Sequence, residues 1–123
     1  MINIKELAVG NWVRFPHGID KIDELCMWAN YAAPATNRPV HVLRLEPIEI
    51  TPEILEKNGW KFENGYSDTV DSIGRMIEYY HFEGILRLYV DDKPYTTIGS
   101  GLMYVHQLQN ALTLCGIDKE IEL

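Results

Sequence analysis

The stretch that decides the fold is Tyr104-Val105-His106-Gln107-Leu108-Gln109-Asn110-Ala111-Leu112-Thr113-Leu114-Cys115-Gly116. Apolar residues recur in it at spacings of three and four, which places them on one face of a helix: Val105, Leu108, Leu112 and Cys115. Ser100 is suited to cap the start of this helix, and Gly116 is suited to end it in the left-handed conformation. We therefore predict a C-terminal helix near residues 101–115 that is integral to the core.

The opposite face of this helix is polar. Four side chains at helical spacing form it: His106, Gln109, Asn110 and Thr113. Such a face can bind the polar edge of a ligand or a loop of a partner. It can equally hydrogen-bond to neighbouring strands and fix the helix, since buried amide side chains need partners. We favour the second interpretation and expect replacement of His106 to lower stability.

A second, shorter helix is predicted near residues 51–59, upstream of the first. Thr51 is the expected N-cap, because its hydroxyl can accept from an otherwise unpaired backbone N–H. Pro52 follows at the first helical position, where its missing donor is harmless. Gly59 supplies the stop.

Most of the remaining chain has the pattern of strands. Residues 76–82 and 85–90 are β-type runs around a Glu83-Gly84 turn, and this predicts a hairpin on which residues 95–98 pair back. Near the N-terminus, Gly10-Asn11 separates two apolar runs and predicts a tight hairpin or a bend.

Three segments give weaker signals. Residues 19–33 fit either a helix or a strand, residues 40–45 read as a strand, and residues 65–74 read as a polar loop. We predict an α+β protein that forms a single domain over residues 1–123, with a mostly antiparallel sheet and both helices packed on it. A small SH3-like barrel is the alternative form of that sheet, because the stretch from Leu7 to Val13 resembles the opening of such barrels.

Composition and charge exclude several classes of function. The chain has 123 residues, a formal charge of -7 and 11 scattered Lys and Arg. It lacks the basic stripe that binds a nucleic-acid backbone or an anionic membrane surface. We also expect no signal peptide, because residues 1–7 show no basic leader followed by an apolar core, and no apolar run is long enough to span a bilayer. We therefore expect a cytoplasmic protein that acts on neither nucleic acid nor membrane.

The residues that usually carry catalysis or bind metals are dispersed. Cys26 and Cys115 lie among apolar residues, so both are predicted to be buried free thiols. The four histidines have no paired ligand spacing on any one element: His17, His41, His81 and His106. No nucleophile, phosphate-loop or dinucleotide motif occurs. We predict no catalytic residue, no metal and no cofactor.

Aromatic residues are abundant for so small a chain. Adjacent Tyr79 and Tyr80 must point to opposite faces of a strand, so one of them lies outside the core unless both faces are covered. Exposed aromatic side chains favour a partner surface, whereas a core filled with aromatic residues is the alternative for the same set. The candidate binding residues are His106, Gln109, Asn110, Tyr79, Tyr80 and Trp28.

The C-terminal stretch from Tyr104 to Asn110 resembles a pattern of small proteins encoded by gut-bacterial genomes, prophages and phages. Two further pieces fit that pattern: Ile50-Thr51 through Gly59-Trp60, and Val9 through Val13. Leu114-Cys115 departs from it, and residues 19–39 have no counterpart. The resemblance implies a phage or mobile-element accessory protein, and it assigns no activity.

Two functions remain. The first is a non-enzymatic module that binds a protein partner or associates with itself. The second is a small-molecule or nucleotide-binding protein, or a minor enzyme, with a pocket near the His106 face.

Overall fold

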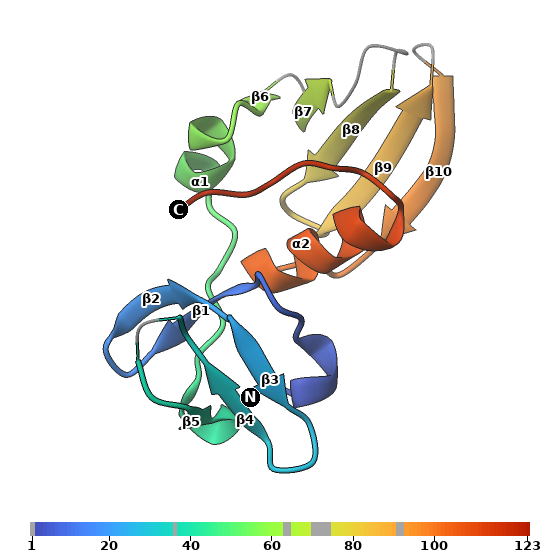
Figure 1. Ribbon diagram of the computed structural model, residues 1–123. Coiled ribbons are helices and arrows are strands. Elements are labelled where there is room, and N and C mark those ends of the chain that lie inside the picture. The colour runs from blue at the N-terminus through green and yellow to red at the C-terminus, as the bar shows by residue number, and fades with distance from the viewer. Residues whose placement is uncertain (1, 36, 63–64, 70–74, 91–92) are drawn as a thin grey trace. The chain divides into compact units, whose positions relative to one another are not determined.

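The computed structural model describes residues 2–35, 37–62, 65–69, 75–90 and 93–123 (Figure 1). The chain divides into two compact units. The first comprises Met1–Glu49 and Tyr104–Asn110, and the second comprises Ile50–Met103 and Ala111–Leu123. The single domain over residues 1–123 stays a prediction.

The first unit is built from short elements. They are η1 (Ile4–Glu6), β1 (Trp12–Phe15), β2 (Gly18–Lys21), β3 (Glu24–Cys26), β4 (Tyr31–Ala33), β5 (Val40–His41) and η2 (Val42–Arg44), followed by the first half of α2 (Val105–Leu114). Strands β1 and β2 form one antiparallel pair, and β3, β4 and β5 form a second antiparallel sheet with β4 in the middle. Buried apolar side chains, among them Val13, Phe15 and Ile22, form the core of this unit.

The second unit is dominated by a five-stranded antiparallel sheet. Its elements are α1 (Pro52–Lys57), β6 (Lys61–Phe62), β7 (Tyr66–Thr69), β8 (Arg75–Tyr80), β9 (Ile85–Val90) and β10 (Lys93–Gly99), followed by the second half of α2. The strand order is β10-β9-β8-β7-β6. Ile77 pairs with Leu88 and Tyr79 with Leu86, and all four side chains are buried, so one face of the sheet belongs to the core.

The predicted α+β class is confirmed, because the described strands form three antiparallel sheets accompanied by two α-helices, one of them C-terminal. No closed barrel is found within the described ranges. Neither of the described α-helices has the length and apolar character that crossing a membrane requires.

Local sequence signals predicted α1 and the hairpin of β8 and β9 correctly. The Thr51 hydroxyl accepts from the Ile54 N–H at 3.3 Å, Pro52 begins the helix, and Gly59 follows it with φ +87°. Strands β8 and β9 pair over their whole length, and β10 pairs back on β9 as predicted. These elements are specified by caps and turns that lie next to them in the sequence.

The Gly10-Asn11 signal marks a bend, and the hairpin alternative is wrong. The Asn11 N–H donates to the Ala8 carbonyl at 3.1 Å, and the residues before it form the 3₁₀-helix η1 instead of a strand. Strand β1 pairs with β2, so the hairpin lies one strand further along the chain.

Three segments with weak sequence signals either differ from the predicted structure or adopt one of the two predicted alternatives. Residues 19–33 contribute to strands β2, β3 and β4 and contain no helix. The predicted strand at 40–45 is wrong beyond His41, because the His41 ring accepts from the Leu43 N–H and caps η2. The predicted loop at 65–74 is wrong at Tyr66–Thr69, which pairs with β8, while residues 70–74 lie outside the described residues.

The start of the C-terminal helix was also predicted wrongly. Helix α2 begins at Val105, so Ser100 does not cap it. Tyr104 forms an isolated bridge with Glu49, and the Val105 N–H donates to the Ile48 carbonyl at 2.8 Å. Pairing with a segment distant in sequence therefore holds the chain extended up to Tyr104.

The apolar stripe of α2 is confirmed over three of its four residues. Val105, Leu108 and Leu112 are buried, whereas Cys115 is exposed. The burial predicted for Cys115 is wrong because α2 ends at Leu114, one residue before the spacing would return that side chain to the core. Cys26 is half-buried, and both cysteines are free thiols.

We predict that Gly84→Ala destabilises the protein much more than Gly101→Ala. Both glycines have a left-handed backbone, with φ +62° and +67°, so alanine costs about 1–2 kcal/mol at either position. A Cβ at Gly84 would lie 2.5 Å from the Leu102 nitrogen, whereas a Cβ at Gly101 meets nothing within 4 Å. The clash should add about 1–3 kcal/mol to the cost at Gly84 in urea unfolding. Equal losses for the two variants would contradict this packing.

Candidate functional site

The first half of α2 supplies side-chain amides to the main chain near the N-terminus. The Gln109 amide accepts from the Trp12 N–H at 2.9 Å and donates to the Gly10 carbonyl at 3.0 Å. These two main-chain groups are two residues apart and point the same way, as they do along a strand edge. One glutamine side chain therefore satisfies them as a neighbouring strand would.

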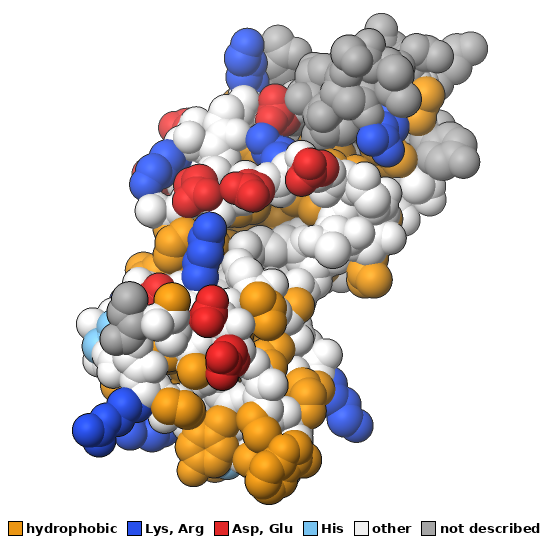
Figure 2. Space-filling model, in the orientation of Figure 1, with side chains coloured by type: hydrophobic (Ala, Val, Ile, Leu, Met, Phe, Trp, Pro, Cys, Tyr) orange, Lys and Arg blue, Asp and Glu red, His pale blue; other side chains and the backbone are white. Residues whose placement is uncertain are grey.

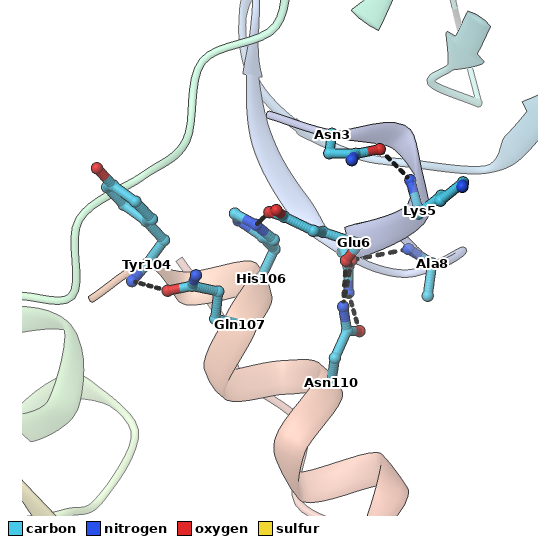
Figure 3. A network of polar contacts seen from close by, with 9 residues as sticks. Asn3, Lys5, Glu6, Ala8, Tyr104, His106, Gln107 and Asn110 are labelled. Atoms are coloured by element: carbon cyan, nitrogen blue, oxygen red, sulfur yellow. Dashed lines mark hydrogen bonds and ion pairs between the residues drawn. The ribbon is translucent and has the colours of Figure 1, made fainter. Parts of the chain in front are cut away.

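Asn110 forms the second part of this network. Its amide exchanges hydrogen bonds with the Asn11 amide, at 2.8 and 3.2 Å, and also donates to the Glu6 carbonyl at 2.7 Å. Asn11 is only 3% exposed, and its oxygen accepts in addition from the Ala8 N–H at 2.9 Å. Figure 3 shows Asn110 pointing from α2 toward this segment. The two amides thus tie residues 6–11 to the helix.

His106 lies one helical turn before Asn110 on α2 and is almost fully buried, at 1% exposure. Its Nε2 is 3.6 Å from the Glu6 carboxylate, and its ring stacks on Tyr104 (Figure 3). Within the described part of the chain, neither ring nitrogen has a hydrogen-bond partner. His106 is therefore part of the packed scaffold and not a side chain open to a ligand.

Burial lowers the pKa of His106, because the charged imidazolium loses its hydration. The nearby Glu6 carboxylate acts in the opposite direction and only partly offsets this effect. The ring is therefore neutral at pH 7. Since the folded pKa is below the unfolded value, the unfolded chain binds the proton more readily, and stability falls as the pH drops below about 6.5.

We predict that His106→Gln removes part of the acid sensitivity of folding. The free energy of unfolding of the wild type should fall between pH 7.5 and 5.5 by at most about 1.4 kcal/mol from this group, because the unfolded histidine takes up its proton near pH 6.5. His106→Gln should lose less over the same range. Leu114→Ala, at an 87% exposed position of the second unit, is the control; it removes no titratable group and should keep the wild-type slope. An unchanged slope in His106→Gln would contradict this account.

Tyr79 and Tyr80 of the second unit lie on opposite faces of β8, as expected. Tyr79 is fully buried, its hydroxyl donates to the Leu102 carbonyl, and burial raises its pKa to about 12. Tyr80 lies on the other face beside Glu78, and hydrogen bonding to Glu78 raises its pKa. The Arg87 guanidinium lies 5.1 Å from the centroid of the Tyr80 ring. Tyr79 is a core residue, and Tyr80 belongs to a self-paired polar cluster.

Trp28, another predicted binding residue, is exposed to solvent over 90% of its surface. It lies in the four-residue loop between β3 and β4, and its neighbours Met27 and Tyr31 are also exposed. Together these three residues are called the tip patch. Figure 2 shows hydrophobic side chains gathered over this end of the first unit.

The loop that carries the tip patch is held at its base. Asn30 adopts a left-handed conformation with φ 58°, which asparagine tolerates better than most residues. Its carbonyl accepts from the Val42 N–H at 2.8 Å, and the Tyr31 ring packs edge-on against the His41 ring at 5.4 Å between centroids. The exposed indole is therefore presented from an ordered hairpin.

A hollow of about 430 Å³ adjoins the base of this loop in the first unit. Its apolar wall is formed by Ile2, Ile4, Val42 and Leu43. Asn3, Asn30 and His41 add polar groups to its lining. Sequence reasoning missed this hollow, because its lining comes from three segments that only the fold brings together.

The six predicted site residues thus separate into distinct groups. His106, Gln109 and Asn110 act together in the scaffold of the first unit, Trp28 is exposed at its tip, and Tyr79 and Tyr80 belong to the second unit. Within the described ranges no three His, Cys, Asp or Glu side chains are grouped so that they could hold a metal ion.

Comparisons with protein-family models, with curated proteins and with solved structures gave no match for this chain.

Proposed function

We propose that this protein is a non-enzymatic interaction module that binds a protein partner through the tip patch. The observation that carries the proposal is the 90% exposure of Trp28 on an ordered hairpin. Burying a large apolar side chain is worth roughly 1.5–3 kcal/mol, and tryptophan is the residue type most enriched among binding hot spots. An indole held by a fixed loop also loses little conformational freedom on binding.

The polar face of α2 is not favoured as a ligand site. The amides of Gln109 and Asn110 are already paired with main-chain and side-chain groups, and His106 is buried. A ligand would have to displace these contacts. This supports the interaction module over a small-molecule or nucleotide-binding protein, or an enzyme, with its pocket at His106.

The biological setting is part of the same proposal. The resemblance to accessory proteins of phages and mobile elements supports a role beside such elements, in the cytoplasm. The charge of -7 supports a protein partner over nucleic acid or an anionic membrane.

We predict that peptides selected on the intact chain from a random-peptide display library depend on Trp28. Trp28→Ala should weaken their binding at least about tenfold, which corresponds to about 1.4 kcal/mol, by fluorescence anisotropy. Phe82→Ala is the matched control, since Phe82 is also an exposed aromatic side chain but lies in the second unit. It should leave the affinity unchanged. Equal binding by Trp28→Ala and the wild type would contradict the proposal.

A further inference from the structure

The hollow beside the tip patch has the chemistry of a pocket for an uncharged, largely apolar group. The seven side chains around it include four aliphatic ones and no Lys, Arg, Asp or Glu. Its volume of about 430 Å³ lies within the range of 300–1,000 Å³ that is usual for ligand pockets. A charged side chain would lose its hydration there without an ionic partner.

The polar groups that line the hollow can form hydrogen bonds with one donor and one acceptor of a group that enters it. The Leu43 N–H donates to His41 Nδ1 at 3.2 Å, so Nδ1 is the accepting nitrogen and Nε2 carries the ring hydrogen. His41 can therefore donate a hydrogen bond to a carbonyl that enters the hollow. Asn3 also lines the hollow; its Oδ1 accepts from the Lys5 N–H at 3.0 Å, and the second lone pair of that oxygen suits a group with a single N–H donor.

An indole side chain has these properties. It is flat and apolar, it carries no charge, and its only polar group is one N–H donor. The first unit exposes such a side chain at Trp28, two residues from Asn30 in the lining of the hollow. The same surface therefore carries both an exposed indole and a hollow that suits an indole.

We propose that the partner is a second copy of this chain, and that Trp28 of each copy enters the hollow of the other. Reciprocal insertion of this kind is an isologous contact, which closes on two copies and does not continue into a filament. The inference rests on the proposed function, because it names the occupant of the same surface.

The size of the contact sets its strength. Each buried aromatic side chain contributes about 150–250 Å², so two indoles together bury on the order of 300–500 Å². This is below the 1,200–2,000 Å² of stable complexes. The charge of -7 on each copy also opposes association. The dimer is therefore a weak one that forms reversibly as concentration rises.

Sedimentation velocity of the purified full chain over a concentration series tests this inference. The wild type should pass from monomer to dimer. Trp28→Ala removes the indole, and Leu43→Glu places a charge in the hollow at a side chain that is 63% exposed. Each variant should raise the dissociation constant at least about tenfold. Leu114→Ala, at an 87% exposed leucine of the second unit, is the matched control and should dimerise like the wild type.

Mixing the two variants tests reciprocity. Trp28→Ala keeps its hollow and Leu43→Glu keeps its indole, so an equal mixture retains one of the two contacts and should associate more than either variant alone at the highest concentrations. Circular dichroism checks that both variants are folded. A wild type that stays monomeric throughout, or a dimer that neither substitution weakens, would overturn the inference. Peptide binding that requires Trp28 would still support the proposed function in that case, so the two failures are distinguishable.

Discussion

The first unit depends on hydrogen bonds that side-chain amides of α2 make to the main chain near the N-terminus. Its strands are two to four residues long, so their ladders satisfy few backbone groups. Gln109 pairs with Gly10 and Trp12, and Asn110 pairs with Glu6 and Asn11. A buried backbone group without a partner costs roughly 1–3 kcal/mol, whereas each bond contributes only about 1 kcal/mol net. The network therefore matters mainly because its loss would leave several polar groups unsatisfied at once.

This arrangement explains how the unit can expose a large apolar side chain without losing its structure. The core of the unit is formed by other residues, such as Val13, Phe15 and Ile22. The β3–β4 loop is held by main-chain hydrogen bonds at its base. Its Trp28 side chain is exposed to solvent and does not pack in that core. Substitution at the tip should therefore affect binding more than folding, and this separation is what a dedicated interaction surface requires.

Sequence alone predicted those features whose cause is local. The caps of α1, the turn between β8 and β9 and the glycine stop after α2 all depend on residues within a few positions. Strand β7 was missed because three of its four residues, Tyr66–Thr69, are polar, although it pairs with the next strand along the chain. The start of α2 was missed because Tyr104 and Val105 are fixed by contacts with residues 48–49, which are distant in sequence. Propensity cannot report such contacts.

The candidate site was predictable to a similar extent. The polar face of α2 was recognised from helical spacing, and its scaffold role was favoured because buried amides need partners. Trp28 was recognised as an aromatic residue with two alternative fates, and only the fold shows that it is exposed. The adjoining hollow could not be predicted, since residues 2–4, 30 and 41–43 become neighbours only through tertiary structure.

A double-mutant cycle on Asn11→Ala and Asn110→Ala tests the central claim most directly. Urea unfolding of the wild type, the two single variants and the double variant measures the coupling free energy between the two amides. Their reciprocal hydrogen bonds predict a favourable coupling of about 0.5–3 kcal/mol, with the double variant losing less than the two single losses combined. Strictly additive losses would mean that the amides act independently, and would contradict the view that α2 holds the N-terminal segment through them.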